Sequence, residues 1–228
     1  MAKTPSHPVT LVSLAEHCNM WTWVGAAGTL FVVTSLWQGH RSGALKPSGP
    51  SWLLAITCLV GMLVLVKGEA DNIRSISGMA IPDVTFPYDR DYVLKFAEAI
   101  GKDGRSRYAT FQLGLDTLAP PAFTFFTGLA LNSARLPSAV RLLALAPLLG
   151  YFTSVLLANA LMPVVMLSYP ALDAQPGAEL LLILVPWLDF LKYSLHGAVW
   201  VVILAALVVK AISAVVRKPS KELQQKRD

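Results

Sequence analysis

The chain has 228 residues, of which 54% are hydrophobic and only 14% are charged, and its formal net charge is +5. A soluble domain usually carries about 25% charged residues, so this composition excludes an ordinary soluble protein. Several apolar stretches approach or exceed the ~20 residues that one helical membrane crossing needs. We therefore expect an all-α, multi-pass transmembrane bundle of five spans with one short amphipathic surface helix, forming a single membrane domain.

The first apolar stretch, residues 20–38, is preceded by a mixed segment, residues 1–19. That segment contains Glu16 and His17 and has no small-residue cleavage site after an apolar core, so it does not match a secretory signal. It also lacks the Arg-rich, acid-poor composition of a transit peptide. We expect the first apolar stretch to be a permanent membrane anchor.

The second span is expected over residues 52–67, after a turn rich in Gly, Pro and Ser, so spans one and two together cover 20–67. A polar loop, 68–108, follows, and its first part looks irregular. Asp89 is a suitable N-cap for a short helix over 90–101 with apolar residues on one side. Two alternatives stay open: this helix lies on the membrane surface or under a partner subunit, or it packs on its own bundle.

Spans three and four are expected within residues 109–168. In the fourth, Gly150, Ser154 and Ala158 recur at every fourth position and form a strip of small residues. Such strips let neighbouring helices approach closely, so we assign these three residues to helix packing.

The last apolar stretch is interrupted by Pro186 and carries Asp189 and Lys192. We therefore divide residues 178–216 into an interfacial lead-in over 178–190 and a fifth span from about residue 193. Asp189 and Lys192 are expected to reach the membrane interface.

Basic residues gather on one side of the expected bundle. The loops 39–51 and 133–139 and the basic tail 217–228 carry an excess of Lys and Arg residues, whereas the loop 169–178 has none and the long loop 68–108 balances basic with acidic residues. The positive-inside rule then places the C-terminus in the cytoplasm or matrix and the N-terminus outside. This asymmetry accounts for the net charge, so no nucleic-acid partner is expected.

A set of residues at characteristic spacings carries a family resemblance: Tyr88, Gly101, Gly104, Arg105, Tyr108, Asp116 and Pro120. With them, the chain resembles a family of small four-span bacterial-type integral membrane proteins over about residues 52–210, most closely over 88–120. That family tends to carry Asp-x-x-Glu-Asn in its next helix. Here only Asn159 of that trio is present, with Val155 and Ala158 at the acidic positions. The resemblance implies a membrane fold and no known activity.

Four polar residues descend the third span at spacings of three and four and form one stripe: Arg105, Tyr108, Gln112 and Asp116. A carboxyl group facing lipid is costly, so Asp116 must face other helices or water. Its expected neighbours are Tyr151, Asn159 and Lys192. The sequence favours a structural polar clasp made of Arg105, Tyr108, Gln112, Asp116, Asn159 and Lys192 over a proton or ion step.

Pro120 and Pro121 follow Asp116 within an otherwise apolar segment. Proline removes a helical hydrogen bond and kinks a helix. We expect a kink whose freed carbonyl groups, near Asp116 and Leu118, are satisfied by donors such as Thr117.

Known chemical motifs are absent from the sequence. It has no Walker loop, no Gly-x-Gly-x-x-Gly motif, no Gly-x-Ser-x-Gly motif and no His-Glu-x-x-His motif. The four histidines fall in different segments, and Cys18 and Cys58 form no metal-binding spacing. We therefore assign no catalytic residue, cofactor, haem or metal.

These features favour a non-catalytic accessory or scaffold subunit of a larger membrane complex. By analogy, the complex is a respiratory-chain or ATP synthase assembly of the mitochondrial inner membrane, in which the chain is a supernumerary subunit. Its partners are then other membrane subunits and the surrounding lipids. The alternative is a small membrane transporter or membrane enzyme that uses Asp116 as its ionisable centre.

Overall fold

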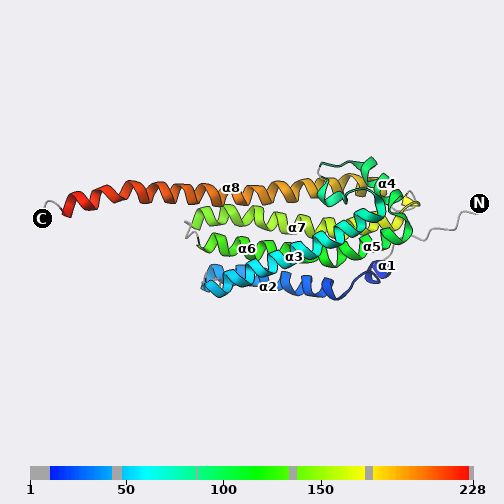
Figure 1. The fold of residues 1–228 in the computed structure, drawn as a ribbon, viewed down its shortest axis with the longest axis horizontal. Coiled ribbons are helices and arrows are strands. Elements are labelled where there is room, and N and C mark those ends of the chain that lie inside the picture. The colour runs from blue at the N-terminus through cyan, green and yellow to red at the C-terminus, as the bar shows by residue number, and fades with distance from the viewer. Residues whose placement is uncertain (1–10, 43–47, 86, 134–137, 173–176, 226–228) are drawn as a thin grey trace, which may run out of the picture.

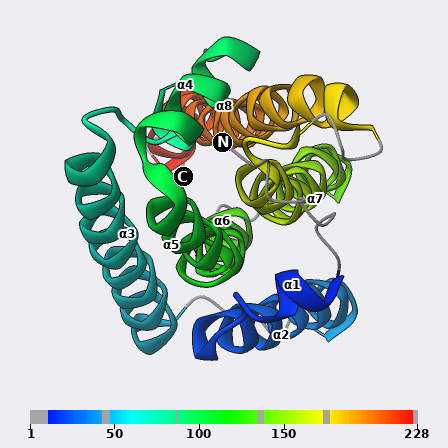
Figure 2. The same ribbon diagram turned by 90° about the vertical axis from the view of Figure 1, so that its right-hand side faces the viewer.

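The computed structural model describes residues 11–42, 48–85, 87–133, 138–172 and 177–225. These residues form helices joined by short turns and contain no strand, which confirms the all-α prediction. Figure 1 shows the long helices side by side and alternating in direction, and Figure 2 shows the same bundle end-on. The elements are α1 (Leu11–Ala15), α2 (Met20–Ser42), α3 (Gly49–Ser77), η1 (Pro82–Val84), α4 (Arg90–Ala99), α5 (Gly101–Leu113), η2 (Leu115–Leu118), α6 (Ala119–Ser133), α7 (Ser138–Ser168) and α8 (Ala178–Gln225).

Three of these helices are long and apolar enough to cross a membrane, over Gly49–Ser77, Ala139–Ser168 and Ala178–Ser213. A shorter apolar helical stretch covers Met20–Val32. The exposed side chains of the three long helices are largely Leu, Val and Ile. Such a surface suits contact with lipid, because the hydrocarbon region is as apolar as these side chains.

Helix α3 is longer than the sequence suggests, and the prediction of an irregular loop directly after residue 67 is wrong. The helix continues through the charged residues to Ser77 and ends at Gly78, which has φ 67°. Glycine adopts this left-handed conformation without steric cost. Lys67 pairs with Asp71 at 2.7 Å across one helical turn, which supports the charged extension.

Helix α4 begins at the predicted N-cap, where the Asp89 carboxylate accepts a hydrogen bond from the Tyr92 amide at 2.9 Å. Its apolar side chains Val93 and Phe96 are buried against the bundle in a cluster that also includes Ile73 of α3 and Met166 of α7. The isolated chain therefore provides its own cover for this face of α4.

The third apolar segment is not one helix with a kink, as predicted, but two helices separated by the 3-10 turn η2. Pro120 and Pro121 occupy the first turn of α6, where a missing amide hydrogen is tolerated. A continuous helix would bring the Pro120 ring against the Asp116 carbonyl group. Instead, the Asp116 carbonyl accepts from the Ala119 amide, and Thr117 donates its hydroxyl to the Gly114 carbonyl at 2.5 Å.

Helix α8 is continuous from Ala178 to Gln225, so the predicted division into a lead-in and a separate span is wrong. It packs along α7, and a second apolar cluster joins α6, α7 and α8 through Leu131, Leu148 and Ile203. At ~1.5 Å per residue its 48 residues reach about 72 Å, more than twice the hydrocarbon thickness of a bilayer. Its C-terminal part extends beyond the other helices (Figure 1).

Candidate buried charged site

The polar centre of the bundle is Asp83, in the short turn η1. Ile81 and Pro82 are buried on its N-terminal side and anchor the turn between α3 and α8. The Asp83 side chain consequently points into the protein and is only 9% exposed. A carboxylate in this position needs donors, because an unpaired buried charge is strongly destabilising.

The Asp83 carboxylate accepts from three side chains. One oxygen accepts from the Tyr108 hydroxyl at 2.6 Å and from the Gln112 amide at 2.5 Å, both on α5. The other oxygen pairs with the Lys192 ammonium group at 3.1 Å. The backbone carbonyl of Asp83 also accepts from the Tyr193 hydroxyl. These contacts tie η1, α5 and α8 together.

Lys192 connects Asp83 to a second buried carboxylate. Its ammonium group lies 2.7 Å from Asp189, one turn earlier on α8, and Asp189 accepts a hydrogen bond from the Tyr88 hydroxyl. Burial, then the nearby carboxylates of Asp189 and Asp83, raises the pKa of the Tyr88 phenol well above its ordinary value. Tyr88 therefore keeps its proton and acts as a donor at physiological pH.

A third carboxyl group, that of Asp116 in η2, lies within electrostatic reach of Asp83, Asp189 and Lys192. Asp116 is 9% exposed, and the Asn159 side chain of α7 lies beside it. Among the described residues, neither amide atom of Asn159 has a hydrogen-bond partner of ordinary geometry. Three carboxyl groups thus lie around one buried ammonium group, which pairs directly with Asp83 and Asp189, and the Asn159 amide lies beside Asp116.

A cavity of about 330 Å³ extends from this cluster between α3, α6, α7 and α8. Its polar wall includes Asp83, Asp116 and Lys192, and its remaining wall is apolar and aromatic, with Phe123, Tyr151 and Val155. The cavity therefore combines ionisable groups at one side with a surface suited to an apolar solute.

His196 lies on the wall of the same cavity, one turn after Lys192. The Trp200 indole donates to its Nε2 atom at 2.8 Å. An indole nitrogen is only a donor, so Nε2 must be an acceptor and the imidazole in this arrangement is neutral. The described residues contain no group of three His, Cys, Asp or Glu side chains arranged to hold a metal ion.

The structure brings together most, but not all, of the residues assigned to the polar clasp. Tyr108, Gln112 and Lys192 bind Asp83 rather than Asp116, whereas Asn159 lies beside Asp116. Arg105 lies apart from the cluster: it donates to the Ala97 carbonyl at 2.9 Å and stacks over the Tyr169 ring at 5.1 Å.

The strip of small residues on α7 is buried. An added Cβ at Gly150 would lie 2.8 Å from Leu195 of α8, and the exposed fraction of Ser154 and of Ala158 is 2%. The Ser154 hydroxyl bonds within its own helix, to the carbonyls of Gly150 and Tyr151 at 2.9 Å. Gly150 therefore permits the close contact between α7 and α8.

Sequence reasoning missed the central role of Asp83 and placed Asp189 and Lys192 at the membrane interface. The exposed fractions of Asp189 and Lys192 are only 1% and 7%, so neither reaches the surface. One sequence signal for this pair exists: ionisable residues three apart in an apolar helix share one face and favour a functional site. Asp83 has no comparable signal, because its role depends on how the loop folds back.

No protein-family model, curated protein or solved structure matches the chain. The site must therefore be interpreted from its own chemistry.

Proposed function

We propose that the protein is a membrane carrier that couples the movement of a small solute to proton binding at the Asp83, Lys192, Asp189 and Asp116 cluster. The observation that carries this proposal is the burial of three carboxyl groups around one ammonium group on the wall of a cavity. With all four groups ionised the cluster carries two excess negative charges. At low dielectric such an excess favours binding of a proton or another cation.

The carrier crosses the membrane five times in this proposal, through α2, α3, the α5–α6 pair, α7 and α8. These segments alternate in direction along the bundle, so α1 and the C-terminal end of α8 lie at opposite ends (Figure 1). The positive-inside rule then orients the C-terminal end toward the cytoplasm or matrix. The charged cluster lies part-way along the bundle, with Asp116 between α5 and α6 and with Asp189 and Lys192 more than two turns into α8.

The cavity indicates the class of solute. Its aromatic and aliphatic wall suits a small apolar body, and Lys192, Asp83 and Asp116 suit one polar or charged group on that body. The amide of Asn159 lies beside Asp116, where a proton or solute would bind.

A pH-jump measurement on a supported membrane tests this proposal without knowledge of the solute. Purified protein in liposomes is adsorbed on a sensor, and the charge displaced by a rapid pH change is recorded. We expect a transient current from the wild-type protein and its loss in Asp116→Asn. A wild-type current equal to that of empty liposomes would contradict the proposal.

The accessory-subunit function is the competing proposal, and the protruding end of α8 favours it. A helix that extends so far beyond its own bundle offers a surface for other subunits, for instance those of a respiratory-chain or ATP synthase complex in the mitochondrial inner membrane (Figure 1). Native gel separation in mild detergent with mass spectrometry distinguishes the two proposals. A lone 24.6 kDa species supports the carrier, and stable co-migration with other membrane subunits supports the accessory role.

A further inference from the structure

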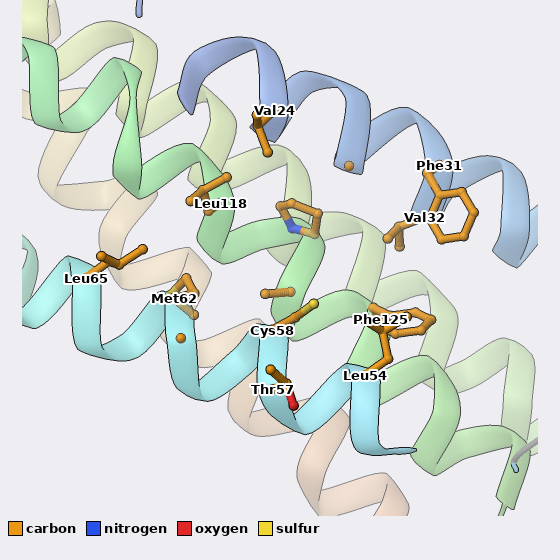
Figure 3. A pocket seen from close by; sticks show the side chains of 14 residues that line it. Val24, Phe31, Val32, Leu54, Thr57, Cys58, Met62, Leu65, Leu118 and Phe125 are labelled. Atoms are coloured by element: carbon orange, nitrogen blue, oxygen red, sulfur yellow. The ribbon is translucent and has the colours of Figure 1, made fainter. Parts of the chain in front are cut away.

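Helices α2 and α3 leave a groove between them. Both pack on η2 and α6, and Figure 2 shows them apart, on neighbouring sides of the bundle. Figure 3 shows Val24 and Val32 of α2 and Met62 and Leu65 of α3 around the same space, with Leu118 between the two helices. The groove has a volume of about 390 Å³.

The wall of this α2–α3 groove is almost entirely apolar. Besides aliphatic and phenyl groups it contains only Thr57 and Cys58 as weakly polar side chains, and Gly28 and Gly61 leave it open. An added Cβ at Gly61 would meet no atom within 4 Å. This chemistry suits a hydrocarbon chain.

A polar hollow of about 470 Å³ is lined by the neighbouring turns of the same helices, with Trp21 of α2, Glu69 of α3 and Leu115 of η2. On α2, Trp21 lines the hollow and lies on the same helix face as Val24 and Gly28, which line the groove. On α3, Glu69 lines the hollow and lies on the same face as Leu65, which lines the groove. In η2, Leu115 lines the hollow and Leu118 lines the groove. The apolar and polar parts therefore form one amphipathic site.

The charges of the hollow complement a zwitterionic headgroup. Arg107 binds Glu69 through two nitrogens at 2.5 and 2.9 Å, which leaves three of its five N–H donors for a phosphate, and the nearby Ser106 hydroxyl is hydrogen-bonded to the His17 ring at 3.0 Å. Asp103 adds a second carboxylate, and Trp21 offers an aromatic face. A carboxylate and an indole together attract a headgroup ammonium.

The apolar, open groove suits an acyl chain better than a protein helix, which is ~10 Å wide with its side chains. An extended acyl chain is narrower and needs no hydrogen bonds from the wall.

We infer that the α2–α3 groove and its polar hollow form a binding site for one zwitterionic phospholipid. An acyl chain fills the groove, the phosphate binds Arg107, and the headgroup ammonium lies near Asp103 and Trp21. The site adjoins the cavity of the charged cluster, since Met62 lines both the groove and that cavity, but it contains none of the four charged residues of the cluster and does not depend on the carrier function.

Native mass spectrometry tests this site with the full-length chain. The protein is reconstituted in nanodiscs of equal parts phosphatidylcholine and phosphatidylglycerol and then released from them. We expect one retained phosphatidylcholine per chain. Gly61→Leu fills the groove and should lower this occupancy at least about fivefold. The matched control Gly197→Leu, on an exposed and open part of α8, should leave it unchanged.

The headgroup part is tested by Asp103→Lys, which should shift the retained lipid toward phosphatidylglycerol. Three outcomes overturn the inference: no retained lipid, an equal mixture of both lipids, or equal losses in Gly61→Leu and Gly197→Leu. A dimer in place of the lipid adduct would assign the groove to a second copy of the chain and also overturn it. The pH-jump current serves as a separate readout, because Gly61→Leu should leave it intact.

Discussion

Asp83 shows at the scale of single residues how a short turn becomes the centre of a membrane bundle. Its carboxylate accepts from Tyr108, Gln112 and Lys192, which come from two helices distant in the sequence. The donors expected for Asp116 are thereby committed to Asp83. Asp116 is left beside Asn159 and the cavity, where it has fewer fixed partners. In the proposed carrier, Asp83 therefore has the structural role and Asp116 exchanges the proton.

Removal of the Asp83 carboxylate should destabilise the fold strongly. Asp83→Ala leaves Lys192 without one of its two partners and two further donors unsatisfied, and breaking a buried pair costs about 3–5 kcal/mol. Thermal unfolding in detergent should show a clear fall in Tm. The control Asp71→Ala removes only an exposed pair with Lys67, worth about 0–1 kcal/mol. Equal effects of the two substitutions would refute the structural role of Asp83.

Substitutions of Asp116 separate structure from function. Asp116→Asn keeps hydrogen bonding without the charge, so the protein should remain folded and membrane-inserted while the pH-jump current disappears. Asp116→Leu should also reduce the amount of folded protein, because each lost partner costs about 1–3 kcal/mol. An unchanged current in Asp116→Asn, measured at equal protein density, would show that Asp116 has only the structural role of the polar clasp.

At the scale of elements, the break between α5 and α6 brings three segments to one point. Gly114 ends α5 where an added Cβ would lie 2.8 Å from the Asn19 side chain, which also caps α2. On α2, Gly25 faces Thr117 of η2 even more closely. Helix α2 therefore packs directly on the 3-10 turn η2, which carries Asp116.

This contact predicts opposite effects for two glycine substitutions. An added Cβ at Gly25 would collide with Thr117, so Gly25→Ala should lower the Tm. Gly68 lies on an open, exposed face inside α3, and replacing a helical glycine by alanine there should stabilise by up to ~1 kcal/mol. Thermal unfolding of both variants checks the prediction, and a Tm for Gly25→Ala at or above the wild type would contradict the packing.

Sequence patterns predicted the helical class and the approximate apolar segments, because hydropathy and caps such as Asp89 are local signals. They did not predict the length of α3, whose extension pairs Glu69 with Arg107 of α5, or the continuity of α8, which packs along α7. The candidate site was also only partly predictable. The sequence indicated the polar stripe on α5, but it did not indicate that Asp83 accepts hydrogen bonds from Tyr108 and Gln112 of that stripe. Long-range folding of the 78–89 loop decides that pairing.

At the scale of the whole molecule, charge asymmetry and the alternation of the helices predict the topology. Cysteines introduced at Ser48 and Ser220 should be labelled from one side of the membrane, and a cysteine at Ser75 from the other. The background should first lose Cys18 and Cys58, because neither is fully buried. Labelling of all three positions from one side would contradict the five-span arrangement.

The central claim is that Asp116 exchanges a proton within a buried charged site. Infrared difference spectroscopy on the reconstituted protein, acid minus alkaline, observes this directly through the band of a protonated carboxyl group. We predict a band in the wild type that disappears in Asp116→Asn and persists in the exposed control Asp91→Asn. A difference spectrum that is identical in the wild type and in folded Asp116→Asn would contradict the claim.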